Sequence, residues 1–229
     1  KLSYHYLCQG NRKGWVWAAQ IGRLSNRKEK AIVSTFIRKI KSFIGRVKGY
    51  AKLTYYYKFC IHFPIKRAFF IDSRGGKDLA GNLFQIAQEA CGRNIQVYLS
   101  VRHDSMDKVR GILKAGHFPG LKIVTRYSRE YYKALGTSKY WLTDMCLDYS
   151  AVKRPEQIII NTWHGTPLKT LEFDWKDHRH EMGGGPRDHL RCDYMAVPNR
   201  FLFHVLLSSS HVEPLFTGKA LYCGYPRNS

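Results

Sequence analysis

The chain has 229 residues, with 38 Lys or Arg against 17 Asp or Glu, which gives a formal net charge of +21. This length allows a substantial buried core, and the charge calls for a polyanionic partner. No stretch approaches the ~20 continuous apolar residues of a membrane span. The six cysteines are scattered without a C-x-x-C pair, which excludes a disulfide scaffold and indicates a reduced, cytosolic protein with buried thiols. Three of them lie in apolar or aromatic sequence: Cys60, Cys146 and Cys223.

The charge is distributed unevenly along the chain. Residues 1–70 contain 16 Lys or Arg and the single acid Glu29, a net charge of +15. Residues 71–229 contain 22 Lys or Arg and 16 acids, a net charge of +6. We therefore divide the chain into a basic segment, residues 1–67, and an α/β domain, residues 68–229, with different functions.

The basic segment contains one predicted amphipathic helix, from Ala31 to Ala51. Apolar residues recur along one face at steps of three and four, at Val33, Phe36, Ile37, Ile40, Ile44, Val47 and Ala51. Basic residues surround that face, namely Arg38, Lys39, Lys41, Arg46, Lys48 and Lys52. The pattern is typical of a helix lying on an anionic membrane surface. A helix packed on its own domain is the alternative. A nucleic-acid-binding surface is a third interpretation. The sequence contains no recognisable nucleic-acid-binding motif, so we expect no nucleic-acid partner.

From residue 68 onward the chain alternates between predicted strands and helices. We predict strands at 68–72, 95–101, 121–125, 140–143, 157–163, 193–197 and 220–223. We predict helices at 81–92, 104–115, 128–135 and 199–207, the third ended by Gly136. Such alternation indicates a mainly parallel sheet with helices on both faces. Ligands of such folds bind outside the carboxyl ends of the strands.

The turn after the first predicted strand has the sequence D-S-R-G-G-K over residues 72–77. Gly75 and Gly76 allow close backbone approach to a substrate, and Arg74 and Lys77 attract phosphate. A Walker loop is excluded because its G-x-x-x-x-G-K-[ST] pattern is absent. An ordinary turn remains an equal alternative to a phosphate-binding loop.

The segment from Gln157 to Lys169 is the part of the sequence that most strongly indicates a functional site. An apolar, β-branched strand ends at His164 and Gly165. Thr166 then suits the N-cap of a helix and Pro167 its first residue, which would put Lys169 in the first helical turn. A titratable base would lie beside backbone N–H groups that favour phosphate. A hydrogen-bonded core histidine is the alternative interpretation of His164.

The sequence that follows Lys169 predicts neither a metal site nor regular secondary structure. Residues 182–186 read M-G-G-G-P, which predicts a flexible loop. Four side chains in or near this loop are of types that bind zinc: His178, His180, His189 and Cys192. Their spacing fits no standard zinc pattern, so we expect no metal.

Three sequence elements resemble one known family. Residues 162–169, T-W-H-G-T-P-L-K, resemble the signature of the CDP-glycerol glycerophosphotransferases, which include the teichoic acid primases and polymerases of Gram-positive bacteria. Residues 224–228, G-Y-P-R-N, resemble the G-Y-P-R-N-D that follows in that family, and residues 76–82 are similar to its earlier G-x-x-x-x-x-N element. The match covers about residues 70–228, in the family's order.

The resemblance implies a GT-B-like enzyme of two Rossmann-like domains, of which this chain provides the N-terminal, acceptor-binding one. The donor would be CDP-glycerol or CDP-ribitol, and the acceptor a lipid-linked polyol phosphate. The nucleotide site would lie in the second domain, beyond these residues. No further cofactor is implied. The protein would act at the cytoplasmic face of the cell membrane, bound peripherally.

The resemblance also implies roles for individual residues. His164 would be the general base that takes the proton from the acceptor hydroxyl, because histidine changes charge near neutral pH. Phosphate would be held by two groups of residues, one around this histidine (Gly165, Thr166, Lys169 and Arg227) and one in the first turn (Arg74, Gly75, Gly76 and Lys77). The alternative from another functional class is a non-catalytic, membrane-peripheral module that binds anionic polymer or lipid.

Overall fold

The computed structural model describes residues 27–175 and 184–228, and the chain divides into two compact units, Lys1–Ala51 and Lys52–Ser229. Helix α2 (Arg27–His62) crosses this division. Two aromatic side chains near its end, Tyr56 and Phe59, are only 2% exposed and belong to the core of the second unit. The division by contacts therefore lies earlier in the chain than the division at residue 67 that charge predicts.

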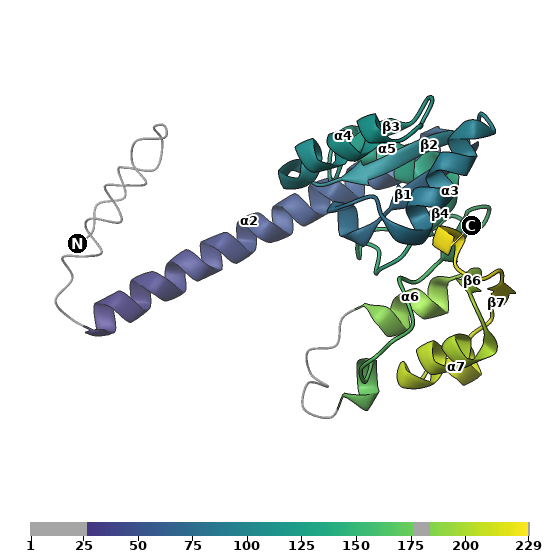
Figure 1. Cartoon of the computed structure of the whole chain (residues 1–229). Helices are drawn as coiled ribbons and strands as arrows, with labels where there is room; N and C mark the ends of the chain where they lie inside the picture. Colours follow the sequence, from purple (N-terminus) through teal and green to yellow (C-terminus); the bar gives the residue numbers. More distant parts are fainter. Residues whose placement is uncertain (1–26, 176–183, 229) are drawn as a thin grey trace. The chain divides into compact units, whose positions relative to one another are not determined.

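The second unit is built on a seven-stranded parallel sheet in the order β3-β2-β1-β4-β5-β6-β7 (Figure 1). Every neighbouring pair runs parallel. The strands are β1 (Lys66–Asp72), β2 (Gln96–Val101), β3 (Lys122–Thr125), β4 (Ser138–Thr143), β5 (Ile158–Asn161), β6 (Tyr194–Val197) and β7 (Lys219–Tyr222). The predicted α/β, Rossmann-like architecture is confirmed.

Helices cover both faces of the sheet and bury one apolar cluster on each. They are α3 (Gly81–Gly92), α4 (Met106–Ala115), α5 (Arg129–Thr137), α6 (Gly185–Arg191) and α7 (Arg200–Ser209). Alternation along β1 explains the two clusters, because Phe70 points to one and Ile71 to the other. Helices α3 and α4 pack on the Ile71 face, and α5, α7 and the end of α2 pack on the Phe70 face.

Most predicted elements are present within a few residues of their predicted bounds, and two differ. Of the loop predicted at residues 182–186, the structure describes residues 184–186, and α6 begins within them, at Gly185, with Pro186 in its first turn. The helix predicted from Thr166 does not form; residues 164–171 are irregular and lead to a short 3-10 turn, Glu172–Asp174. Leu168 within that loop is 99% exposed, so the segment lacks the buried apolar face that stabilises most protein helices.

Gly136 has a role that the sequence did not predict. Helix α5 continues past it to Thr137 instead of ending there. A Cβ atom at Gly136 would lie 3.2 Å from Cys60 Sγ and 3.3 Å from Phe59 Cβ. The glycine therefore permits close approach of α2 and α5, which is a packing role and not a helix stop.

The cysteines of the described residues are all free thiols, and the prediction that they are buried is only partly correct. Cys91 and Cys192 are buried, but Cys146 and Cys223 are exposed. The residues that precede these two, Met145 and Tyr222, are themselves exposed, whereas Leu147, which follows Cys146, is buried in the core. Cys8 lies outside the described residues.

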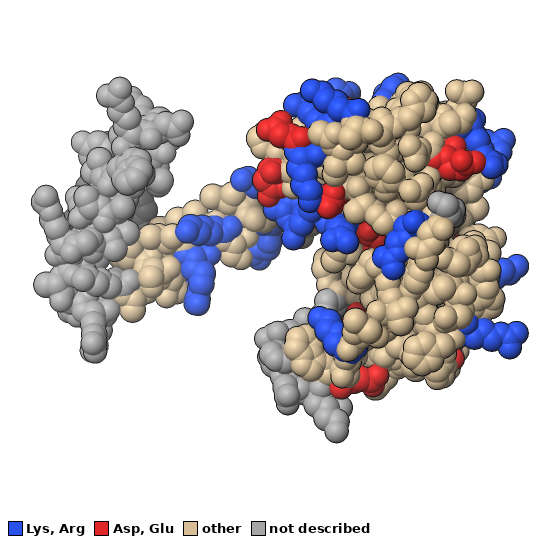
Figure 2. All heavy atoms as spheres, in the orientation of Figure 1, with Lys and Arg blue, Asp and Glu red and all other residues tan. Residues whose placement is uncertain are grey.

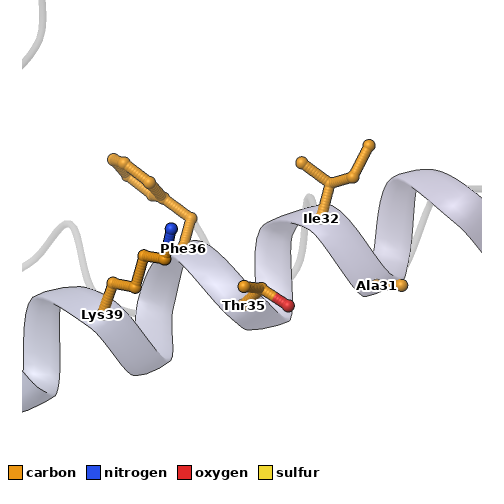
Figure 3. A pocket seen from close by; sticks show the side chains of 5 residues that line it. All are labelled: Ala31, Ile32, Thr35, Phe36 and Lys39. Carbon is orange, nitrogen blue, oxygen red and sulfur yellow. The ribbon is translucent and has the colours of Figure 1, made fainter.

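In the first unit, helix α2 leaves large apolar side chains exposed. Ile32, Phe36, Phe43 and Val47 are among them, with exposed fractions of 68%, 64%, 62% and 51%. Lys and Arg side chains lie along the same helix (Figure 2). Figure 3 shows Ile32 and Phe36 projecting from one side, where five residues line an open hollow: Ala31, Ile32, Thr35, Phe36 and Lys39. Within the described ranges, no helix is both long and apolar enough to cross a membrane.

Candidate active site at the carboxyl edge of the sheet

The candidate site lies where the strand order reverses, between β1 and β4. Strand β1 lies between β2 and β4. The chain adds β2 and β3 on one side of β1, and then returns to add β4 and the later strands on the other side. In parallel α/β sheets this arrangement opens a crevice at the carboxyl ends of the strands, where ligands bind. The segments that follow β1, β4 and β5 carry Arg74, Asp144 and His164 respectively.

The turn after β1 is held by a carboxylate from the end of β4. Asp144 accepts a hydrogen bond from the main-chain N–H of Arg74, at 2.7 Å, and one from the Ser73 hydroxyl, at 3.2 Å. The main-chain N–H groups of Gly76 and Lys77 donate within the turn, to Ser73 and Arg74. The anion at this turn is therefore Asp144 itself. A phosphate would meet the exposed side chains of Arg74 and Lys77 rather than a complete cradle of N–H groups.

Burial raises the pKa of Asp144, while the bonds from Arg74 and Ser73 and the nearby His164 oppose that rise.

Gly76 is needed in this turn for two reasons. Its φ is +79°, a region that L side chains rarely adopt, and a Cβ atom there would lie 3.2 Å from the main-chain nitrogen of Arg102. The turn is thus fixed by contacts on both of its sides.

The turn after β5 replaces the predicted helix. Trp163 has φ +50° and Gly165 has φ +149°, both outside the helical region. The hydroxyl of Thr166 lies 3.0 Å from the Tyr225 hydroxyl, so it bonds a distant segment and does not cap a helix. The macrodipole that a helix would have supplied to a phosphate is absent from residues 164–171.

The imidazole of His164 is oriented by two contacts. Its Nδ1 lies 2.9 Å from the main-chain oxygen of Asp144, and its ring stacks on Trp163 with centroids 4.3 Å apart. A carbonyl oxygen can only accept, so Nδ1 carries the proton. In the neutral ring Nε2 then holds the lone pair, and no side chain of the described residues hydrogen-bonds to it. Such an imidazole can accept a proton at Nε2.

The C-terminal turn, Pro226–Asn228, contacts the histidine loop. The guanidinium of Arg227 stacks on the Tyr225 ring at 4.6 Å, and its Nη1 donates to the main-chain oxygen of His164 at 3.3 Å. A Cβ atom at Gly165 would lie 3.7 Å from Arg227 Nη2. The structure thus brings Gly165, Thr166 and Arg227 together beside His164.

The other predicted residues lie apart from this group. Lys169 is exposed, and its Nζ lies 5.8 Å from the centre of the Trp175 ring, with no contact to His164. Five predicted membrane-facing residues are exposed on α2, namely Arg38, Lys39, Lys41, Arg46 and Lys48. The side chain of Lys52 lies outside the described part, as do His178 and His180. Across residues 27–175 and 184–228, no cluster of three or more His, Cys, Asp and Glu could hold a metal ion.

Two residues of the site were missed from the sequence. Asp144 follows the predicted strand 140–143 directly, so the rule that ligands meet strand carboxyl ends could have identified it. Asn82, the last residue of the G-x-x-x-x-x-N element, donates to the main-chain oxygens of Thr162 and Trp163. Nothing in the local sequence indicates that pairing, because it joins residues 80 and 81 positions apart.

The sequence pattern of the CDP-Glycerol:Poly(glycerophosphate) glycerophosphotransferase family matches residues 54–229. The chain belongs to this family. The predicted membership is confirmed, and the site described above lies wholly within the matched residues.

Curated relatives are teichoic acid enzymes of bacteria. The chain is 34% identical over 112 residues to the teichoic acid poly(glycerol phosphate) polymerase of Staphylococcus epidermidis, a match that covers 46% of this chain and 15% of that protein. It is 29% identical over 112 residues to the teichoic acid glycerol-phosphate transferase of Staphylococcus aureus, covering 46% and 28%. It is 25% identical over 216 residues to the polymerase of Bacillus subtilis, covering 88% and 26%.

Solved structures share the glycerophosphotransferase fold. The wall teichoic acid polymerase TagF matches with a TM-score of 0.64 at 24% identity, over 86% of this chain and 48% of that one. A TagF variant with CDPG matches with a TM-score of 0.62 over 86% and 49%. The chain therefore spans about half of the TagF structures and between 15% and 28% of the three curated relatives.

Proposed function

We propose that the chain carries the acceptor side of a glycerophosphotransferase site, with His164 as the general base. The observation that carries this proposal is the hydrogen bond from His164 Nδ1–H to the Asp144 carbonyl. It fixes the tautomer in which Nε2 accepts a proton. Family membership supplies the reaction class, and the position at the strand-order reversal supports a substrate crevice.

In the proposed reaction, Nε2 takes the proton from the terminal hydroxyl of a lipid-linked polyol-phosphate acceptor. The oxygen forms a bond to the glycerol-bearing phosphorus of CDP-glycerol, the bond from that phosphorus to the bridging oxygen breaks, and CMP leaves. CDP-ribitol would react in the same way. Phosphoryl transfer depends chiefly on positioning and charge stabilisation. The cationic side chains of Arg227, beside His164, and of Arg74 and Lys77, in the turn after β1, would supply that charge.

The test is His164→Ala in the full-length gene product, with CMP release measured from CDP-glycerol and, in parallel, from CDP-ribitol. We expect turnover to fall by ~10²–10⁴-fold, the usual contribution of a general base. His204→Ala is the matched control, because His204 is an exposed histidine on α7 paired with Glu213, and turnover should stay near the wild-type value. Turnover near wild type in His164→Ala would refute the assignment.

We also propose that residues 27–51 of α2 bind an anionic membrane surface from its cytoplasmic face, which would bring the lipid-linked acceptor within reach. Exposed apolar side chains such as Phe36 and Phe43, beside exposed basic residues, support this. A non-catalytic module that binds anionic polymer or lipid would have the same helix. It would release no CMP in the assay above, with or without His164.

A further inference from the structure

Asn82 connects three segments that lie far apart in the sequence. It is 4% exposed, in the first turn of α3. Its Nδ2 donates to the main-chain oxygens of Thr162 and Trp163, at 3.1 and 3.4 Å, and its Oδ1 accepts from the Arg227 N–H at 3.4 Å. Both ends of the amide face partners of the matching kind, so the orientation of the side chain is fixed by its contacts.

The peptide that Asn82 holds is the one that leads into His164. Trp163 adopts φ +50°, a conformation that an L residue with a bulky side chain rarely populates unless its surroundings fix it. Its N–H donates to Asn161 Oδ1 at 2.8 Å, and its carbonyl accepts from Asn82. The Trp163 ring stacks on the His164 imidazole. The Asn161 and Asn82 amides, with the Thr162 hydroxyl that also donates to the Trp163 oxygen at 3.2 Å, therefore hold the peptide that sets the direction of the Trp163 ring.

We infer that Asn82 is a positioning residue for His164, and that it acts through the left-handed turn at Trp163, whose ring stacks on the imidazole. The inference rests on the proposed role of His164. An amide is required because the position needs two donors and one acceptor. Asp at residue 82 would keep the acceptor for Arg227 and lose both donors to the turn, and Ala would lose all three bonds.

The direct test is NMR spectroscopy of the protein with isotope-labelled histidines. The imidazole resonances of His164 are identified by their disappearance in His164→Ala. We expect them to shift in Asn82→Asp and in Asn82→Ala, because the stacked Trp163 ring is released and its ring current on His164 changes. They should remain at their wild-type positions in Asn199→Ala, a matched control that removes an asparagine capping α7 through a 2.9 Å bond to the Leu202 N–H.

Kinetics provide the second measurement, as CMP release from CDP-glycerol by the full-length gene product. A displaced base lowers the chemical step, so we expect kcat to fall by roughly 10- to 100-fold in both Asn82 variants. KM for CDP-glycerol should change less than kcat, because a displaced base weakens the transition state more than the bound ground state. Asn199→Ala should retain the wild-type kcat.

Two results would overturn the inference. Wild-type His164 resonances in a folded Asn82→Asp protein would mean that the turn holds its shape without the amide. Loss of folding in both Asn82 variants, with Asn199→Ala folded, would mean that Asn82 supports the fold as a whole. Failure of the proposed function is distinct, since His164→Ala would then keep its turnover whether or not the His164 resonances respond to residue 82.

Discussion

At the scale of single residues, two histidines of this chain have opposite surroundings. His164 is exposed at the carboxyl edge of the sheet and donates from Nδ1 to a main-chain carbonyl. His189 is 1% exposed, in α6, and its Nδ1 lies 2.9 Å from the hydroxyl of Ser210. Burial lowers the pKa of His189 to about 4. The first imidazole is exposed to solvent, as the proposed general base requires, and the second is kept neutral inside the fold.

The burial of His189 predicts that the protein loses stability in mild acid. The unfolded chain protonates this residue near pH 6.5, and the folded chain only near pH 4, so the unfolded state binds more protons between those values. Stability from this group is complete above pH 6.5 and is lost as pH falls to 4. Between pH 7 and pH 5 it should lower the free energy of unfolding by about 2 kcal/mol.

Urea unfolding of the wild type and of His189→Gln, each at pH 7 and pH 5, measures this loss. Glutamine can still hydrogen-bond to Ser210 but does not titrate. We expect the decrease between the two pH values to be about 2 kcal/mol smaller in the variant. Other groups titrate equally in both proteins, so equal decreases would show that His189 is not the acid-sensitive residue.

At the scale of elements, α2 has two parts with different environments. Before residue 51 its apolar side chains are largely exposed, whereas Tyr56 and Phe59 are buried in the cluster against α5 and α7. Gly136 on α5 allows the helices to approach closely at Phe59. The last turns of α2 therefore stabilise the sheet unit, although the helix is continuous from Arg27 to His62.

This division of α2 predicts unequal effects of two aromatic truncations that lie two residues apart. Phe59→Ala should lower the free energy of unfolding by ~3–5 kcal/mol, because it removes a fully buried ring from a packed core. Tyr57→Ala removes an exposed ring and should lower the free energy of unfolding by no more than about 0.5 kcal/mol. Thermal or urea unfolding measures both variants. Equal losses would mean that the end of α2 does not belong to the core.

At the scale of the whole molecule, charge and exposed apolar surface occur together in the N-terminal part. Residues 1–70 carry a net +15 and residues 71–229 a net +6. Basic side chains near an anionic lipid surface contribute ~1 kcal/mol each. The proposed membrane contact is therefore assigned to residues 27–51 and not to the sheet unit.

Sedimentation with vesicles tests this assignment. The triple variant Arg38→Glu, Lys41→Glu and Lys48→Glu should have an affinity for vesicles rich in phosphatidylserine that is roughly two orders of magnitude lower than that of the wild type. A control with the same change in net charge, Lys114→Glu, Lys122→Glu and Lys219→Glu in the sheet unit, should bind nearly as well as the wild type. Equal losses in the two triples, or equal wild-type binding to neutral vesicles, would contradict a specific contact by the helix.

The sequence predicted much of the α/β part, and the reason is local. Apolar, β-branched runs such as residues 157–163 are bounded by turn residues, and each predicted strand is present within a few residues of its expected limits. Three particular features were not predictable in this way. They are the irregular loop at Thr166, the packing of Gly136 on α2 and the pairing of Asn82 with the histidine turn, and each depends on a partner from another element.

By itself, the sequence determined the order of strands and helices, the family and the position of His164 at the end of a strand, because periodicity and short motifs are properties of neighbouring residues. Only the tertiary structure decided which nitrogen of His164 carries the proton and why no helix follows it. Those outcomes depend on the Asp144 carbonyl, 20 residues away, and on Tyr225, 59 residues from Thr166. Contacts at such separations exist only after the chain has folded, so local propensity could not determine them.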